Sequence, residues 1–361
     1  MKILILGFTK IKYMPYLNMY LNQLNTKEDE VHLLYWSRDD KADLNVPNGV
    51  VGHKFDICME DTIPLGKKLP IIYKYRKYAR NIIKNLNPDY IIVLHSTTAY
   101  TIKDYLVKKY KKRYLFDYRD LTYEKRFKFY GNAIKQIAEN AYATFTSSDG
   151  FREVLPRENV YTSHNVRPDA VELHLKSKVK NYNKEKPIRL AFWGLLRHYD
   201  INEQIIKSLG KDDRFEIHYY GRAQGRMLEL MEDSKNKYNN FYFHGEYTPD
   251  ELPEIANKTD IIMNIYDKIG TIEFAMGNKY YDGITFCLPQ LCTKDTYMGE
   301  KCMESGVGLA CNPYNQNFAD EIYSYYNNLD RTNFVEDCSK ELRRIVDQMT
   351  EDEKIIKSLF E

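Results

Sequence analysis

The sequence lacks several patterns that define common classes of protein. No G-x-G-x-x-G run follows the first apolar stretch, where Gly7 precedes Phe-Thr-Lys, and this disfavours a dinucleotide-dependent dehydrogenase. A P-loop is absent as well. No apolar run approaches 18 residues, and the apolar start of the chain is too short for a signal peptide. We therefore expect a cytoplasmic protein without a membrane-spanning helix.

Metal ligands and disulfides are also not indicated. The six cysteines form no C-x-x-C pair and have no histidines at metal-ligand spacing, so we interpret them as reduced thiols. No Asp-x-Asp pair suited to a metal–diphosphate complex occurs. The prediction is chemistry without a metal ion or a bound cofactor.

The sequence is long enough for two domains, and its charge is unevenly distributed between its two halves. Its 361 residues exceed one typical core. Residues 1–180 hold 31 Lys and Arg against 20 Asp and Glu, and the rest hold 22 against 31, so the halves carry about +11 and −9. The basic half is expected to face a phosphorylated substrate or an anionic membrane surface. Nucleic acid is not expected, because no recognition motif accompanies the charge.

Apolar runs alternate with helical patterns along the whole chain, which predicts an α/β protein with doubly wound parallel sheets. The expected strands are at residues 2–6, 30–36, 54–57, 89–94, 114–117 and 143–146, then at 188–193, 215–220, 241–243, 260–265, 290–292 and 307–310. We predict Rossmann-like domains over 1–166 and 187–332, a polar linker over 167–186, and a terminal helix over 333–361 that could pack back on the first domain. The two domains are expected to face a cleft, with ligands at the carboxyl ends of their strands.

Residues 276–289 are the first candidate site. A helix that begins after a loop points unpaired backbone N–H groups at the loop, and Asn278, Lys279 and Asp282 stand on its first turns. An ordinary surface helix with a solvated lysine would explain the same residues.

Two glycine–arginine loops are the second candidate. Gly194 is followed by Arg197, and Gly221 by Arg222, each after a predicted strand. Together with Lys279 these arginines would form a diphosphate pocket. The alternative is that both arginines are solvated loop residues.

Five motifs of the second half resemble the nucleotide-sugar domain of a GT-B glycosyltransferase. The similarity is to the large retaining family (family 4-like, group 1) of bacterial capsule, exopolysaccharide and lipopolysaccharide assembly. The motifs are Phe192-Trp-Gly194 with Arg197, Tyr220-Gly-Arg222, His244-Gly-Glu-Tyr247 with Pro249-Asp-Glu-Leu252, Asp260-Ile-Ile-Met263, and Asn278-Lys-Tyr-Tyr-Asp282 with Pro289.

The resemblance implies roles for several residues. Asp282 stands where the family has a glutamate that holds the ribose, and Cys287 stands where it has a glycine. Tyr247, with Glu246, would border the base. Glu273 is the carboxylate nearest to the position of a second family glutamate close to the sugar, and position 274 itself is Phe.

In the first half, the run Asp117-Tyr-Arg-Asp-Leu121 is similar to a strand-end run of the same family. Asp120 would orient the acceptor hydroxyl or, with Arg119, the donor sugar. An Arg–Asp pair that closes the loop is the structural alternative. Gly7 and His95 also end predicted strands and are expected on the acceptor side.

The resemblance implies a metal-independent glycosyltransferase that uses a UDP- or GDP-type sugar donor and a lipid-linked or oligosaccharide acceptor. Lysines interleaved with aromatics over residues 71–84, 108–113 and 123–129 would suit peripheral docking on the inner face of the plasma membrane, although a solvated helix face is an equal alternative. Two other functions stay open. One is a UDP-sugar 2-epimerase on the same architecture, and the other is a non-catalytic glycan- or membrane-binding protein with a decayed site.

Overall fold

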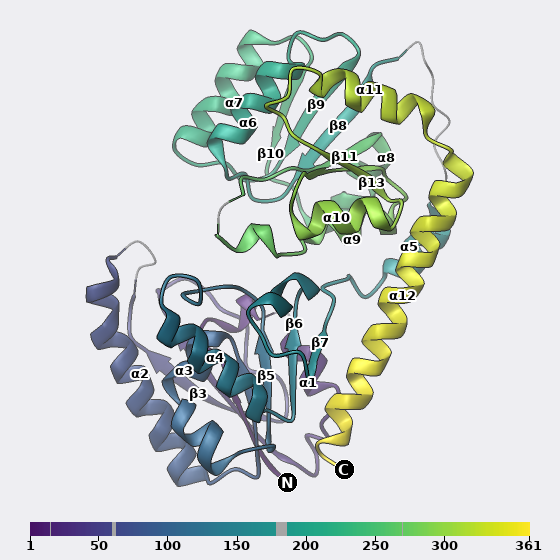
Figure 1. Cartoon of the computed structure of the whole chain (residues 1–361). Coiled ribbons are helices and arrows are strands. Elements are labelled where there is room, and N and C mark those ends of the chain that lie inside the picture. Colours follow the sequence, from purple (N-terminus) through teal and green to yellow (C-terminus); the bar gives the residue numbers. More distant parts are fainter. Residues whose placement is uncertain (15, 60–62, 178–185, 269) are drawn as a thin grey trace. The chain divides into compact units, whose positions relative to one another are not determined.

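The computed structural model describes residues 1–14, 16–59, 63–177, 186–268 and 270–361 (Figure 1). The chain forms two compact units, one of Met1–His164 with Asp347–Glu361 and one of Asn165–Val346. Each unit is built on one parallel sheet. The predicted α/β class with two doubly wound domains is therefore confirmed.

The first unit has a seven-stranded sheet in the order β3-β2-β1-β4-β5-β6-β7. Its strands are β1 (Lys2–Leu6), β2 (Glu30–Ser37), β3 (Val50–Asp56), β4 (Tyr90–Leu94), β5 (Tyr114–Tyr118), β6 (Ala143–Thr146) and β7 (Val160–Thr162). The central strands are apolar along most of their length, as a sheet with helices on both faces requires. The short strand β7 was not predicted, since three residues carry no readable periodicity.

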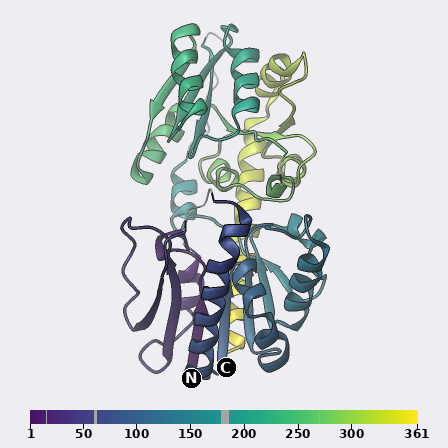
Figure 2. The same ribbon diagram turned by 90° about the vertical axis from the view of Figure 1, so that its left-hand side faces the viewer.

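Helices on the two faces of this sheet come from distant parts of the chain. They are α1 (Leu17–Leu21), α2 (Leu65–Leu86), α3 (Ser96–Thr101), α4 (Lys128–Asn140) and the end of α12 (Arg331–Ser358), with shorter turns η1 (Ile11–Tyr13), the π-type η2 (Tyr105–Lys109) and η3 (Asp149–Glu153). On one face α2, in dark blue in Figure 2, stacks Tyr75 against Trp36. On the other face α1 and α12 contribute to a core that includes Ile356 together with Ile3 and Ile5 of β1.

Two helices of this unit differ from the sequence-based expectation. The helix expected over 71–86 begins at Leu65 and contains Pro70. Pro70 is the sixth residue of α2, so its missing N–H removes one intrahelical hydrogen bond from the second turn. The helix expected over 99–110 is broken into α3 and η2, since α3 ends at Thr101.

The second unit has a six-stranded sheet in the order β10-β9-β8-β11-β12-β13. Its strands are β8 (Ile188–Trp193), β9 (Phe215–Tyr220), β10 (Phe241–Gly245), β11 (Ile261–Asn264), β12 (Gln290–Thr293) and β13 (Gly308–Cys311). Its helices are α5 (Ala170–Lys176), α6 (Tyr199–Leu209), α7 (Arg226–Lys237), α8 (Leu252–Lys258), α9 (Asn278–Thr285), α10 (Tyr297–Glu304) and α11 (Phe318–Asn328), with turns η4 (Pro249–Glu251) and η5 (Gly270–Glu273). Apolar side chains are buried on both faces of this sheet as well.

The last helix, α12, belongs to both units, and its residues from Asp347 onward are part of the first one. Ile356 and Leu359 lie in the core of that unit, and the Tyr142 and Ser358 hydroxyls are hydrogen-bonded at 2.9 Å. The predicted linker 167–186 contains helix α5, and its residues 178–185 lie outside the described residues. Within the described ranges, no helix combines the length and the apolar character that a bilayer-spanning segment needs.

Candidate functional site

Each sheet has one point at which the strand order reverses. In the first unit this point lies between β1 and β4, and in the second between β8 and β11. The loops that leave neighbouring strands there diverge to opposite faces, and the crevice between them is where open α/β sheets bind ligands. The residues that follow these strands are therefore the first candidates for ligand contacts.

In the second unit, two glycine loops lie side by side beyond β8 and β9. Gly194 donates its N–H to Tyr220 O (3.0 Å), and Leu196 donates to Arg222 O (3.0 Å). Gly194 and Gly221 have φ of +117° and +135°. A Cβ on Gly221 would lie 1.7 Å from the carbonyl oxygen of Gly194. Glycine is therefore required at position 221, because the two backbones approach too closely for any side chain.

Lys279, on the first turn of α9, lies beside these loops. Its side chain is only 9% exposed, and Nζ lies 4.0 Å from the ring centre of Phe192 and 5.1 Å from that of Tyr266. Burial lowers the pKa of the ammonium to about 8, against the opposing charge of Asp282. The aromatic faces hold the ammonium without using its N–H groups, so these can be donated to an anion.

Asp282 lies one turn further along α9 and is held by a tryptophan. Trp193 Nε1 donates to its Oδ2 at 2.9 Å. Burial raises the pKa of this carboxyl, while the Trp193 hydrogen bond and the charges of Lys279 and Arg167 oppose the rise. Burial and the charge of Asp282 also raise the pKa of Tyr247 to about 12. Asp282 is thus fixed in place, with Tyr247 within its electrostatic reach.

The remaining residues predicted for this site are more exposed. Arg197 and Arg222 reach solvent from the two glycine loops. Asn278 is not the N-cap of α9, which is Gly277, and its side chain accepts a hydrogen bond from Asn165 (2.9 Å). Glu273 is exposed at the end of η5. Of the residues predicted for this site, four lie close together and are largely shielded from solvent: Gly194, Gly221, Lys279 and Asp282.

Three aromatic residues that build this site received no individual role from the sequence. Phe192 and Trp193 end β8 and were noted only as part of a motif, and Tyr266 follows β11 by two residues. Each of them contacts Lys279 or Asp282. Their position at strand ends beside the reversal point is the signal that could have found them.

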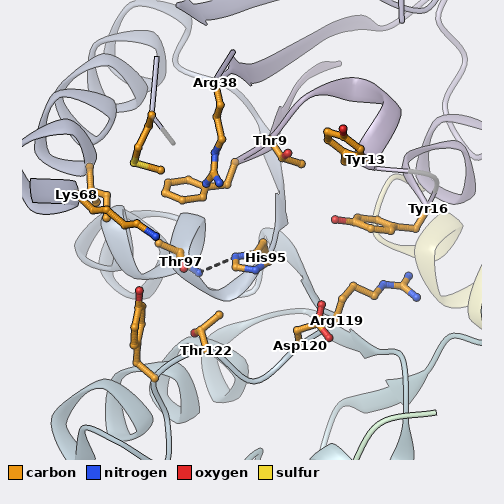
Figure 3. A pocket seen from close by; sticks show the side chains of 14 residues that line it. Thr9, Tyr13, Tyr16, Arg38, Lys68, His95, Thr97, Arg119, Asp120 and Thr122 are labelled. Carbon is orange, nitrogen blue, oxygen red and sulfur yellow. Dashed lines mark hydrogen bonds between the residues drawn. The ribbon is translucent and has the colours of Figure 1, made fainter. Parts of the chain in front are cut away.

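In the first unit a cavity of about 470 Å³ opens at the reversal point (Figure 3). Its lining comes from α2 and from the segments that follow adjacent strands of the sheet. The polar lining includes Tyr16 after β1, Arg38 after β2, Lys68 on α2, His95 and Thr97 after β4, and Arg119 and Asp120 after β5.

His95 lies in this cavity as a neutral imidazole. Burial, with a smaller contribution from the charge of Arg38, lowers its pKa to about 4. Its Nδ1 accepts a hydrogen bond from the backbone N–H of Thr97 at 3.2 Å, so the proton of the neutral ring is on Nε2. The ring is stacked parallel to Phe8, with centroids 6.3 Å apart. His95 is therefore placed to donate one hydrogen bond.

Arg119 pairs with Asp117 and not with Asp120. It donates from Nε and Nη2 to the two carboxylate oxygens of Asp117 (2.6 and 2.8 Å) and from Nη1 to the carbonyl of Ser163 (3.1 Å). The Arg–Asp alternative is thus realised within the predicted run, and Asp120 is left outside that bidentate pair. Desolvation raises the pKa of Asp120 to about 6, against the charge of Arg119.

Gly7 is buried, and its backbone is packed against Tyr75 and Met14. Its carbonyl accepts a hydrogen bond from the Tyr75 hydroxyl at 2.7 Å, and a Cβ there would lie 2.5 Å from Met14 Sδ. The cavity is lined by its neighbours Phe8 and Thr9 instead. Gly7 is therefore not one of the residues that line this cavity, and its place on the acceptor side stays a prediction.

Metal-ligating side chains do not cluster in the part of the chain that the structure describes. No group of three or more His, Cys, Asp or Glu side chains is placed there to hold a metal ion. Metal-independent chemistry stays a prediction.

Comparison with known proteins identifies the fold of this chain. No protein-family model matches the chain, and no curated protein sequence matches it. Among solved structures, it is similar to sucrose-phosphate synthase from Thermosynechococcus elongatus (TM-score 0.68, 12% identity, covering 100% of this chain and 99% of that one). It is also similar to the lipopolysaccharide outer core galactosyltransferase WaaB (TM-score 0.67, 12% identity, covering 99% of this chain and 99% of that one). A third similar structure is Anabaena Alr3699/HepE in complex with UDP (TM-score 0.65, 13% identity, covering 99% of this chain and 100% of that one). Over its full length, the chain has the GT-B fold of these proteins.

Proposed function

We propose that this protein is a glycosyltransferase that moves a sugar from a nucleoside-diphosphate donor to a hydroxyl group. The observation that carries the proposal is the buried ammonium of Lys279, held by Phe192 and Tyr266 beside the Gly194 loop at the reversal point of the second sheet. A buried cation is costly to keep, and an anionic ligand is the group that offsets the cost.

The reaction needs the diphosphate to leave with its charge neutralised. Lys279 would contact the phosphates, with Arg197, Arg222 and the first N–H groups of α9 adding positive potential. Asp282 would accept hydrogen bonds from the ribose hydroxyls, and Tyr247 would border the base. Positive side chains would neutralise the charge that a metal ion neutralises in other transferases, and we propose metal-independent transfer on this basis.

The acceptor would bind in the cavity of the first unit. Asp120 is largely ionised at neutral pH, because its pKa is about 6, and its carboxylate can orient an acceptor hydroxyl. The neutral His95 can donate to a sugar oxygen. Glu273 would lie near the donor sugar, as the family resemblance implies. Retention of the anomeric configuration is proposed from the same resemblance.

A lipid-linked bacterial surface glycan is the acceptor class that we propose, on the inner face of the plasma membrane. The support is two lysine-rich helical segments of the first unit that carry exposed aromatics. Tyr73 on α2 is 55% exposed and Phe129 on α4 is 64% exposed, in segments rich in lysine. Such surfaces bind anionic leaflets through charge and interfacial aromatics.

Donor binding is tested by thermal shift with UDP, GDP, ADP and CMP and their sugars. One diphosphate family is expected to stabilise the protein, by about 2.7 kcal/mol when its concentration is 100 times the Kd. Product analysis with and without an acceptor then separates the activities. Sugar transfer supports the proposal, and a 2-epimerised donor formed without acceptor replaces it with the epimerase. Stabilisation by none of the ligands would indicate a non-catalytic protein.

Lys279 predicts a pH dependence for UDP binding. The free protein loses the ammonium charge as pH rises through about 8, so its affinity for UDP is expected to fall about tenfold between pH 7 and 9. Calorimetric titration across this range measures the slope. Lys279→Arg keeps its charge throughout and is expected to remove the slope, whatever its affinity at pH 7. An unchanged slope in that variant would mean that another group titrates.

A further inference from the structure

Two cysteines and a histidine meet in the second unit beside the carboxyl end of α9. Cys287 follows α9, His174 lies on α5 and Cys338 lies on α12. The thiols of Cys287 and Cys338 are hydrogen-bonded to each other, and Cys287 Sγ lies 3.6 Å from His174 Nδ1. Both cysteines are free thiols. Two neighbouring thiols beside an imidazole are the groups that thiol oxidation chemistry uses.

The backbone holds Cys287 in a conformation that glycine usually adopts. Cys287 is the second residue after α9 and has a φ of +48°. Leu288 N–H donates to Gly283 O (2.8 Å) and Cys287 N–H to Ile284 O (3.4 Å), which is the Schellman arrangement that ends many helices. Glycine takes this position without penalty, whereas a side chain here costs stability. Strained positions of this kind are candidates for function, and here the strained residue carries a thiol.

The contacts of His174 favour its protonated form. Nδ1 lies 3.0 Å from the carbonyl oxygen of Ile284, so it carries a hydrogen and donates. Nε2 lies 2.8 Å from Ser339 Oγ, and that hydroxyl donates its own hydrogen to the Val335 carbonyl (2.8 Å). Both ring nitrogens therefore face acceptors, and an imidazolium satisfies both contacts. A positive charge 3.6 Å from Cys287 Sγ favours the thiolate.

The two thiols are not equivalent. The hydrogen bond from Cys338 lowers the pKa of Cys287 well below its usual range, and His174 lowers it further, against the effect of burial. The same hydrogen bond raises the pKa of Cys338, as do burial and the nearby charges of Asp337 and Glu341. Cys287 is 9% exposed, whereas Cys338 is fully buried. Cys287 thus has the properties of an attacking thiolate, and Cys338 those of the thiol that reacts second.

We propose that Cys287 is an oxidation-sensitive thiol and that hydrogen peroxide converts Cys287 and Cys338 into a disulfide. In the first step the Cys287 thiolate attacks one peroxide oxygen, the O–O bond breaks, and the leaving hydroxide takes the His174 proton to become water. Cys287 is then a sulfenic acid. In the second step the Cys338 sulfur attacks that of Cys287, the S–O bond breaks, and a second water leaves with the Cys338 proton. The two sulfurs together lose two electrons, and the peroxide is reduced to two waters.

The test is peroxide treatment of the full chain, followed by proteolysis and mass spectrometry without a reducing agent. A peptide pair joined through Cys287 and Cys338 is expected, and dithiothreitol should separate it. Cys292 and Cys302 are the internal control, because they are also hydrogen-bonded to each other, but both are fully buried and burial raises the pKa of Cys292. They are expected to stay reduced.

Two results of this experiment would overturn the inference. One is that no Cys287–Cys338 pair forms at a peroxide concentration that oxidises the exposed Cys58. The other is that a Cys292–Cys302 pair forms as fast as the proposed one.

Variants at each cysteine test the order of the two steps. Cys287→Gly removes the attacking thiol and suits the positive φ, so it is expected to fold and to form no disulfide with Cys338. Cys338→Ala leaves the sulfenic acid of Cys287 without a thiol to react with, and dimedone, which captures sulfenic acids, should label Cys287 in this variant. Labelling of Cys338 in Cys287→Gly would contradict the assigned order.

A pH profile tests the charge of His174 separately from its packing. His174→Gln keeps an amide donor but cannot become cationic. Alkylation of Cys287 by iodoacetamide is expected to be about tenfold slower in this variant at pH 7 and to recover as pH rises. Alkylation at the wild-type rate at pH 7 would show that His174 does not activate Cys287. None of these measurements involves a nucleotide, so this inference and the proposed function fail independently.

Discussion

Replacing Lys279 with methionine is expected to weaken UDP binding by about 100-fold and to slow sugar transfer by on the order of 100- to 1,000-fold. Among the described residues, this ammonium is the only cation held against the rings of both Phe192 and Tyr266. Methionine fills a similar volume without the charge, so packing against those rings is retained. The measurements are a UDP titration and the initial rate of transfer.

The same substitution is expected to leave stability unchanged or to raise it. The pKa of Lys279 in the folded chain is about 8, below its ordinary value of 10.5. The unfolded chain therefore binds this proton more tightly, and the buried charge disfavours folding below pH 8 and ceases to do so as pH rises toward 10.5. A variant that binds UDP poorly yet melts no lower than the wild type separates a ligand role from a structural one.

Lys235→Met is the matched control for this experiment. Lys235 lies exposed in the last turn of α7. The control variant is expected to bind UDP and turn over as the wild type does. If Lys279→Met behaves like this control, the phosphate assignment of Lys279 is incorrect.

Gly221→Ala is expected to destabilise the second unit by about 3 kcal/mol. A left-handed φ costs a non-glycine residue about 1–2 kcal/mol, and overpacking commonly adds about 1–3 kcal/mol. Here the added Cβ would lie 1.7 Å from the Gly194 carbonyl oxygen, which belongs to backbone and cannot rotate away. Urea unfolding followed by circular dichroism measures the change.

Gly245→Ala isolates the contribution of that close approach. Gly245 also has a positive φ, of +77°, but a Cβ there meets nothing within 4 Å. Its cost is expected to be about 1 kcal/mol, from backbone conformation alone. Equal losses in the two variants would show that the two glycine loops can separate without penalty.

The fold was predictable from the sequence because it depends on local patterns. The apolar runs at 89–94 and 188–193 indicated central strands of a parallel sheet, since both faces of each had to be covered. Glycines at 194 and 221, each directly after a predicted strand, indicated tight turns at the carboxyl edge of the sheet. These features need only the alternation of strands and helices along the chain.

The sequence predicted that a terminal helix exists, but not which part of the protein it packs against. Its periodicity predicted a helix over 333–361, and α12 spans Arg331–Ser358. Ile356 belongs to the same buried core as Ile3 and Ile5, at the other end of the chain. No local pattern specifies which distant face an apolar stripe will cover.

One pairing between side chains follows from local spacing, since Arg119 is neutralised by Asp117, two residues before it, and not by the adjacent Asp120. Pairings between residues far apart in the sequence were decided by tertiary structure alone. Trp193 reaches Asp282 across 89 positions. Lys68 and Arg38 line one cavity, although Lys68 lies on α2 and Arg38 follows β2. Sequence periodicity determined the two sheets and the edges at which their strands end. Which charges face a ligand at those edges depended on side-chain directions that only the folded chain defines.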